Sequence, residues 1–371
     1  MKIGTDQYNT FDTMTMDCWN DRVYYEGKEF PAGHFAAEIL NFAGAIHDPL
    51  LERITVLTAL VDDLSTAEKN KRHDIAAELK PLLHDTISWL YTCPPFCYCE
   101  EQRAYGALVH ALSEERLDRD YEEEGAHLPY LALSFCEPIL RILVAIYNFC
   151  LLIRAFEMKY LRRSKQRNAD AFAKAAHECF DEDDSFLILL EQMPFGEVEE
   201  FFSYPRVVTG FKYFQDENNE EKWKTAQRVI CKRAIDFYIF DLMNGLHHGH
   251  APSQCQGCGR YFLTTNGHIP KYCDGVAPQD NRYTCRQYGA MMHQKEQNKQ
   301  HPVYRLFNTR TDTIRKHHQR GKISDDLRRE ALYLAGSYRD KALMDNDYAA
   351  DGYARDMELE HIYAEAEKRL K

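Results

Sequence analysis

Four cysteines within one short segment have the residue type and the spacing of a metal site. Cys255 and Cys258 are separated by two residues, and Cys273 and Cys285 stand further along the chain. A C-x2-C pair can turn two thiolates toward one point, and tetrahedral zinc then needs two more ligands from elsewhere. We therefore predict one zinc ion bound by Cys255, Cys258, Cys273 and Cys285. Because four protein ligands leave no open position for water, this zinc is expected to be structural and not catalytic.

The residues around the first pair predict a turn followed by a hairpin. Gly257 and Gly259 flank Cys258, and glycine suits a knuckle in which backbone amides fold back toward thiolate sulfurs. A strand-like run follows over residues 260–263, Asn266-Gly267 is a strong hairpin-turn signal, and residues 269–272 are expected to return. A hairpin accounts for the length of chain before Cys273.

The fourth cysteine lies at the predicted start of a helix. Thr284 and Gln287 match the capping box, with the hydroxyl residue at the N-cap and Gln three positions later. Cys285 then falls in the first turn, where the helix dipole favours an anionic thiolate. Knuckle, hairpin and helix start together predict a treble-clef-like zinc finger. The alternative is four reduced cysteines in a loop-rich segment without metal.

These motifs also carry a family resemblance. The run from Cys255 to Phe262, with Tyr272-Cys273 and Thr284-Cys285-Arg286, resembles the C-terminal zinc finger of a group of uncharacterised Firmicutes proteins. It is similar, more distantly, to the CGNR-type zinc finger of proteins described as bacterial transcription regulators, which also follow a helical N-terminal domain. The resemblance covers residues 250–345. The second group has a Cys-Gly-Asn-Arg signature at the last ligand, whereas this chain has Cys-Arg-Gln-Tyr from Cys285 onward. The first group implies no activity, whereas the second implies DNA binding.

A second group of cysteines lies at a predicted break between helices. Cys93, Cys97 and Cys99 surround two prolines, which limit how the chain can wrap a metal. This favours a buried thiol cluster at a corner between helices, with a second metal site as the open alternative. Because the chain has 12 cysteines and begins with a polar, acidic segment unlike a secretory signal, we expect a cytoplasmic protein.

The spacing of apolar residues predicts a mainly α fold. From His34 onward they recur at helical intervals, and helices are expected over residues 67–92, 100–118, 130–162, 166–181 and 219–247. The most apolar run, residues 138–156, includes Arg141, Asn148 and Arg154, which favours a buried helix over a membrane span. No membrane association is expected.

We expect four regions in chain order. An N-terminal segment with a small hairpin covers residues 1–30, and an acidic helical bundle covers residues 31–249. The treble-clef-like four-cysteine zinc finger covers residues 250–300, and a basic helical hairpin with a C-terminal helix covers residues 301–371. Pro302 is expected to begin the first helix of that hairpin, Gly321 to end it, and Ser324 to cap the second.

Charge is distributed unevenly along the chain. Residues 255–341 contain 16 Lys or Arg and 8 Asp or Glu, whereas the chain totals of 46 and 58 leave 30 and 50 elsewhere. The net charge of −12 therefore conceals a basic region beside an acidic one. In one interpretation the basic region contacts the backbone of DNA or RNA. The residues predicted to do so are Arg260, Lys271, Arg282, Arg286, Lys295, Lys299, Arg305, Arg310, Arg315, Lys316, Arg320 and Lys322.

The sequence favours a binding function over catalysis. It has no G-x-S-x-G, P-loop, G-x-G-x-x-G or H-E-x-x-H motif, so we predict that the protein is not an enzyme. The preferred function is a zinc-finger protein that binds nucleic acid, as a bacterial transcription regulator would, with a bundle that binds a protein partner or forms a homo-oligomer. The alternative is a protein–protein interaction or scaffold protein in which the basic region docks on an acidic bundle and the zinc finger is purely architectural.

Overall fold

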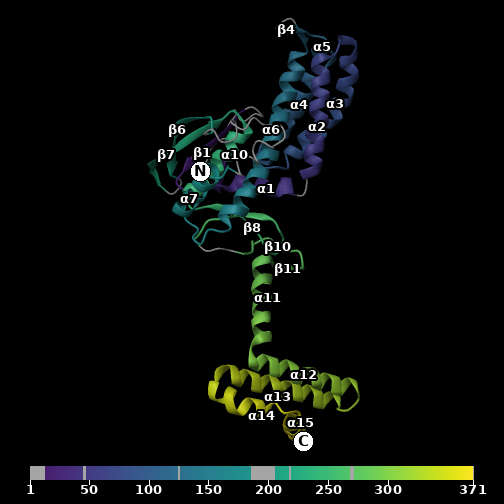
Figure 1. Cartoon of the computed structure of the whole chain (residues 1–371), viewed down its shortest axis with the longest axis vertical. Coiled ribbons are helices and arrows are strands. Elements are labelled where there is room, and N and C mark those ends of the chain that lie inside the picture. Colours follow the sequence, from purple (N-terminus) through teal and green to yellow (C-terminus); the bar gives the residue numbers. More distant parts are fainter. Residues whose placement is uncertain are drawn as a thin grey trace. The chain divides into compact units, whose positions relative to one another are not determined.

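Strands as well as helices build this chain, in contrast to the mainly α prediction. The computed structural model describes residues 13–44, 47–123, 126–184, 205–216, 219–267 and 271–370 (Figure 1). The chain divides into two compact units, Met1–Lys271 and Tyr272–Lys371. The first contains a five-stranded antiparallel sheet among its helices, and three two-stranded sheets complete the strands of the described residues. The fold is therefore mixed α/β, and the mainly α prediction was wrong.

The five-stranded sheet joins N-terminal strands to strands from much later in the chain. Its order is β3-β2-β1-β7-β6. Glu26 and Gly27 form the turn of the predicted N-terminal hairpin, with positive φ values of 45° and 73°. The strand bounds are Met14–Trp19 for β1, Arg22–Tyr25 for β2, Lys28–Pro31 for β3, Val207–Asp216 for β6 and Asn219–Cys231 for β7.

The predicted helix over residues 219–247 needs the largest correction. Its first half is strand β7, and helix α10 (Ala234–His247) begins only afterwards. Buried Val229 and Cys231 alternate in β7 with residues that are less buried, which is the period of a strand. Pairing with β1, where Met16 lies opposite Val229, and with β6 supplies the partners that make this segment extended.

The other predicted helices of the first unit are present with small shifts. The predicted helix 67–92 is α3, 100–118 divides into α4 and α5, 130–162 is α6 with a π-helix at its end, and 166–181 is α7. The bounds are His34–Gly44 (α1), His47–Thr66 (α2), Lys69–Leu90 (α3), Phe96–Tyr98 (η1), Glu101–Ala111 (α4), Glu114–Leu117 (α5), Tyr130–Phe156 (α6), Glu157–Leu161 (the π-helix) and Ala169–Phe180 (α7). A short hairpin, β4 (Tyr121–Glu123) with β5 (Ala126–Leu128), precedes α6.

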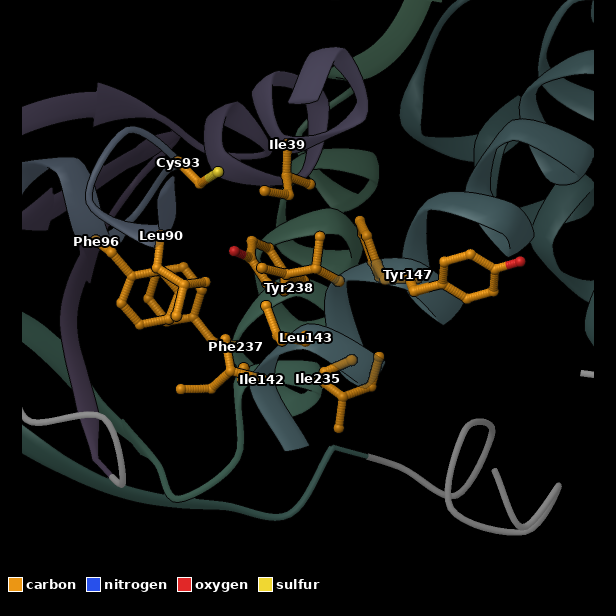
Figure 2. Packing of buried hydrophobic residues seen from close by; sticks show 14 of the residues in the cluster. Ile39, Leu90, Cys93, Phe96, Ile142, Leu143, Tyr147, Ile235, Phe237 and Tyr238 are labelled. Atoms are coloured by element: carbon orange, nitrogen blue, oxygen red, sulfur yellow. The ribbon is translucent and has the colours of Figure 1, made fainter. Parts of the chain in front are cut away.

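Helix α6 is a core helix of the first unit. Its Ile142 and Leu143 lie buried among Ile39 of α1 and Phe237 and Tyr238 of α10 (Figure 2). By length and composition Tyr130–Leu161 could cross a membrane, but 67% of its most apolar stretch is buried inside the fold. That burial agrees with the predicted core helix.

A buried junction of two helices supports the start of α1. The carboxylate of Asp241, on α10, accepts hydrogen bonds from the backbone amides of Gly33 (3.0 Å) and Ala36 (2.9 Å). Gly245 allows the two backbones to approach, since a Cβ at this position would lie 2.8 Å from the Cα of Gly33. The N-terminus of α1 is therefore fixed by α10, about two hundred residues later in the chain.

Helices dominate the second unit after one short hairpin. Its elements are β10 (Val276–Ala277), β11 (Asp280–Thr284), α11 (Cys285–Gln300), α12 (Pro302–Gln319), α13 (Asp325–Met344), a π-helix (Tyr348–Gly352), α14 (Tyr353–Asp356) and α15 (Leu359–Leu370). As predicted, α12 begins at Pro302, Gly321 follows its end with a φ of +72°, and the Ser324 side chain caps α13. Ile314, Leu334 and Ile362 bring α12, α13 and α15 into one small core.

Candidate metal centre

The first two cysteines lie in a tight turn between β8 (Ala251–Gln254) and β9 (Tyr261–Thr264). The Gly259 amide donates to the Cys255 carbonyl at 2.9 Å, and the Cys255 amide donates to the Arg260 carbonyl at 2.8 Å. Gly259 has a φ of +74°, which glycine adopts without the steric cost of a side chain. The Gly257 amide donates to Cys255 Sγ at 3.4 Å. The predicted knuckle is confirmed, with a backbone amide turned toward the sulfur.

The knuckle is anchored on α1 by a side chain that was not predicted from the sequence. Asn41 donates from its amide group to the Tyr261 carbonyl (2.9 Å) and accepts from the Tyr261 amide (2.6 Å). The two residues are 220 positions apart, so no local pattern connects them. Strand β9, predicted as residues 260–263, pairs with β8. Residues 269 and 270, half of the predicted return over residues 269–272, lie outside the described residues.

A second set of backbone bonds orders the segment with the other two cysteines. The Cys285 amide donates to the Gly275 carbonyl at 2.8 Å, and the Arg286 amide donates to the Cys273 carbonyl at 3.0 Å. A Cβ at Gly275 would lie 3.4 Å from Cys273 Sγ, so the chain runs close to this sulfur. The two cysteines are thereby held next to each other.

The predicted capping box at the start of α11 is confirmed. Thr284 Oγ1 accepts from the Gln287 amide at 3.2 Å, and Gln287 Oε1 accepts from the Thr284 amide at 3.0 Å. Cys285 is therefore the first residue of the helix, where the dipole favours a thiolate. One turn later, Gly289 leaves room for the ring of Tyr272, which a Cβ would approach to 2.5 Å.

The four cysteines are close enough to bind one metal ion, as predicted. Their sulfur atoms all lie within 4.8 Å of one another. Four sulfurs bound to zinc at about 2.3 Å are about 3.8 Å apart, so the cluster fits a tetrahedral ion. Cys255, Cys273 and Cys285 are buried and Cys258 is half-buried. Thiolates suit a soft ion such as zinc, whereas calcium and magnesium prefer oxygen ligands.

Cys93, Cys97 and Cys99, the second cysteine group, are separate thiols in the described structure. Among the described residues, no group of Cys, His, Asp and Glu with metal-binding proximity includes Cys93, Cys97 or Cys99. Burial raises the pKa of the Cys93 thiol to about 12 and that of Cys99 to about 11. Cys99 Sγ instead shares a hydrogen bond with the Tyr25 hydroxyl at 3.2 Å, and Cys97 is exposed.

Several of the basic residues predicted to contact nucleic acid have acidic neighbours. Arg282 pairs with Asp280 at 2.7 Å, and Arg286 pairs with Asp274 at 3.0 Å. Arg315 pairs with Asp312 at 3.1 Å, one turn earlier on α12. The Arg286 and Arg315 pairs are largely exposed, so these two cations are only weakly held. Arg282 is held more firmly, because both oxygens of Asp280, which is 23% exposed, accept hydrogen bonds from its guanidinium group.

The remaining predicted cations fall into three groups by position. Arg260 and Lys271 belong to the first unit and are exposed, as is Lys295 on α11, while Lys299 of α11 has no described side chain. Arg310 is half-buried on α12, and its Nε atom is buried without a hydrogen-bond partner. The group on or just after α12 consists of the exposed Arg305, Lys316, Arg320 and Lys322.

Comparison with known proteins gives a match to a protein family. A family model described as "Family of unknown function (DUF6076)" matches residues 203–369, a range that includes the four cysteines and α11 to α15. No curated protein and no solved structure matches the chain. Over residues 203–369, the chain is therefore similar to this family, whose description names no activity.

Proposed function

We propose that the protein binds nucleic acid without catalysing a reaction, and that its metal is a single structural zinc ion. The observation that carries the proposal is the exposed basic face of α12, defined by Arg305, Lys316 and Arg320. Among the described residues none of these three side chains has an acidic partner at ion-pair distance. They are therefore available for phosphate groups.

The spacing of these three residues suits a nucleic-acid backbone. Positions 305 and 316 lie on one face of α12, and Arg320 is the C-cap directly after the helix. The same face carries the exposed Asp312, which pairs with Arg315. At 1.5 Å per residue the face is about 22 Å long, which exceeds the major-groove width of about 12 Å. Cations at its two ends could therefore contact phosphates on both sides of a groove.

The location of the buried apolar residues supports a structural role for the zinc. The two described hydrophobic cores consist of residues from Met14 to Ala251 and from Val303 to Ala366. No fully buried member of either core lies in the described residues between them. A segment without a core of its own needs another source of stability, which a bound metal supplies by linking its four ligands.

The basic face is tested with the full-length, zinc-loaded protein. The triple variant R305Q/K316Q/R320Q removes the three cations, and R329Q/R355Q/K368Q removes three exposed cations elsewhere in the same unit. Fluorescence anisotropy with a short DNA duplex is measured over a series of salt concentrations. We expect the first variant to lower the slope of log affinity against log salt by about 0.9 for each lost contact, and the second to leave it unchanged.

The scaffold alternative is favoured by the acidity of the first unit. Of the 46 basic and 58 acidic residues of the chain, residues 272–371 hold 18 and 16, which leaves 28 and 42 in residues 1–271. A basic face could bind such an acidic protein surface instead of nucleic acid. Absence of binding to duplex DNA, single-stranded DNA and RNA at low salt, combined with salt-sensitive self-association that R305Q/K316Q/R320Q abolishes, would replace the proposal by this alternative.

A further inference from the structure

A cavity of about 400 Å³ lies in the first unit, between the end of α6 and α7. Four of its lining side chains are basic, namely those of Lys159, Arg163, Lys165 and Lys174. We call it the basic cavity. It belongs to a unit in which acidic residues outnumber basic ones by 42 to 28, so a local concentration of positive charge is unexpected there.

The positive charge of the basic cavity is only partly neutralised. Glu178, the one acidic lining residue, pairs with Lys174 at 3.5 Å, and Asp183 pairs with Lys159 at 3.6 Å. Arg163 and Lys165 have no acidic partner within the described part of the chain. Two cations therefore remain to attract an anion into the cavity.

The end of α6 explains why cations line this cavity. The helix widens into a π-helix, in which the Arg162 amide donates to the Glu157 carbonyl at 2.8 Å. Such π-helices occur often at functional sites. Glu157 is buried and pairs with Arg162 at 2.8 Å, so this arginine is engaged elsewhere. The next cations along the turn, Arg163 and Lys165, line the cavity instead.

Helix α7 leaves the cavity open. Ala171, Lys174, Ala175 and Glu178 follow helical steps of three and four residues and form its side of the lining. The two alanines have the smallest side chains of this face, so they leave space, while the lysine adds charge. The arrangement combines an open volume with donors of hydrogen bonds.

We propose that the basic cavity binds the phosphate groups of a small phosphorylated metabolite. Its volume lies in the range of small-molecule sites, about 300 to 1,000 Å³. Arginine and lysine are the side chains that best bind phosphate oxygens, arginine through a fork of parallel N–H groups. The same chemistry would accept the phosphates of a nucleic-acid backbone, and the experiment must therefore separate these two sources.

The probe is ADP, with adenosine as the ligand that lacks phosphate, titrated calorimetrically into the full-length, zinc-loaded protein. We expect saturable binding of ADP and none of adenosine. R163Q/K165Q should weaken ADP binding by about tenfold or more, since it removes two charge-assisted contacts. K71Q/K80Q, the same charge change at exposed positions of α3, should leave it unchanged. A171L keeps every charge but fills the volume and should also weaken binding.

Three results would overturn the small-molecule site. They are absence of saturable ADP binding, equal affinity of wild type and R163Q/K165Q, and displacement of ADP by a single-stranded oligonucleotide that itself depends on Arg163 and Lys165. Thermal melts check that the variants are folded. If A171L is not folded, the comparison of R163Q/K165Q with the control K71Q/K80Q decides the question. R305Q/K316Q/R320Q should bind ADP like the wild type, so failure of this site and failure of the α12 proposal are distinguishable.

Discussion

Asp241 shows how one buried carboxylate links α10 to α1. It is completely buried, and its oxygens accept amide hydrogen bonds at the start of α1. Burial raises its pKa from 3.8 to about 7, although the bonds from Ala36 and Gly33 act in the opposite direction. In the folded protein this group therefore binds a proton more readily than in the unfolded chain.

Asp241 should make stability depend on pH. Because the folded state holds the proton up to about pH 7 and the unfolded state only up to about pH 4, stability should fall as pH rises between these values. One pKa unit corresponds to about 1.4 kcal/mol, so the loss is at most about 4 kcal/mol. D241N removes one carboxylate oxygen that accepts an amide hydrogen bond, so it should lower the free energy of unfolding by a roughly constant amount at every pH. The pH-dependent loss should be absent from this variant. Urea unfolding at several pH values measures both effects. The exposed substitution D85N should retain the wild-type pH dependence.

Thr284 should contribute to both the helix start and the metal site. T284A removes the side chain that accepts the Gln287 amide and should destabilise α11 by about 1 kcal/mol. Since Cys285 is the next residue, the variant should also lose zinc to a competing chelator faster than the wild type. T309A, which removes an exposed hydroxyl bonded to its own helix, should retain zinc normally. Equal rates for T284A and the wild type would show that the cap does not support the site.

At the scale of residues, the sequence predicted the cysteines well because their partners are encoded locally. A C-x2-C pair, adjacent glycines and a capping box each act over a few positions, and the structure contains all three. Asn41 and Asp241 were not predicted, because each is defined by a partner about two hundred residues away. No neighbouring residue distinguishes these two side chains, and they meet Tyr261 and Gly33 only in the folded protein.

At the scale of elements, the crossing of α1 and α10 depends on two glycines. A Cβ at Gly245 would lie 2.8 Å from the Gly33 Cα and 3.1 Å from the Ala32 carbonyl oxygen. Both obstacles are backbone atoms, so the helices would have to separate to accept a methyl group. This junction also holds the Asp241 carboxylate against α1.

The substitution G245A should therefore destabilise the protein by about 1 to 3 kcal/mol, the usual cost of overpacking. Gly106 provides the control, because it also lies within a helix, α4, and a Cβ there would meet nothing within 4 Å. G106A should stabilise the protein by up to about 1 kcal/mol through helix propensity. Urea denaturation of both variants measures the two effects, and a neutral or stabilising G245A would contradict the packing described.

Helix ends could be predicted where the residues that determine them are neighbours in the sequence. Pro302, Gly321 and Ser324 mark the limits of α12 and α13, as expected from capping rules. Strand β7 was misread as helix because its apolar residues lie next to a genuine helix, α10. Only pairing with β1 and β6 makes this segment extended. Such long-range pairing produces little recognisable pattern in a single sequence.

At the scale of the whole molecule, the described chain contains two apolar cores separated in sequence by the cysteine-containing segment. The first core combines the sheet with helices such as α6 and α10, and the second is formed by α12, α13 and α15 with their neighbours. The mainly α prediction failed at this scale, because a sheet of three N-terminal and two late strands cannot be recognised from local periodicity. The excess of basic over acidic residues within residues 255–341 was predictable, since it depends on composition alone.

Because the two cores do not involve the metal ligands, chelation should act locally. We expect removal of zinc to leave most of the helical circular dichroism unchanged, while amide hydrogen exchange accelerates within residues 255–300. Hydrogen exchange followed by mass spectrometry measures both regions in one sample. Accelerated exchange throughout α6 and α10 would show that the metal also stabilises the first core.

The metal content of the purified full-length protein is the first measurement to make on the four-cysteine centre. We expect one zinc ion per chain in the wild type, and loss of stoichiometric zinc in C258S and in C285S, with the helical signal largely preserved. C97S, which changes an exposed cysteine outside the cluster, should retain the ion. Stoichiometric zinc in both C258S and C285S, or a metal-free wild type purified without chelators, would contradict the four-cysteine centre.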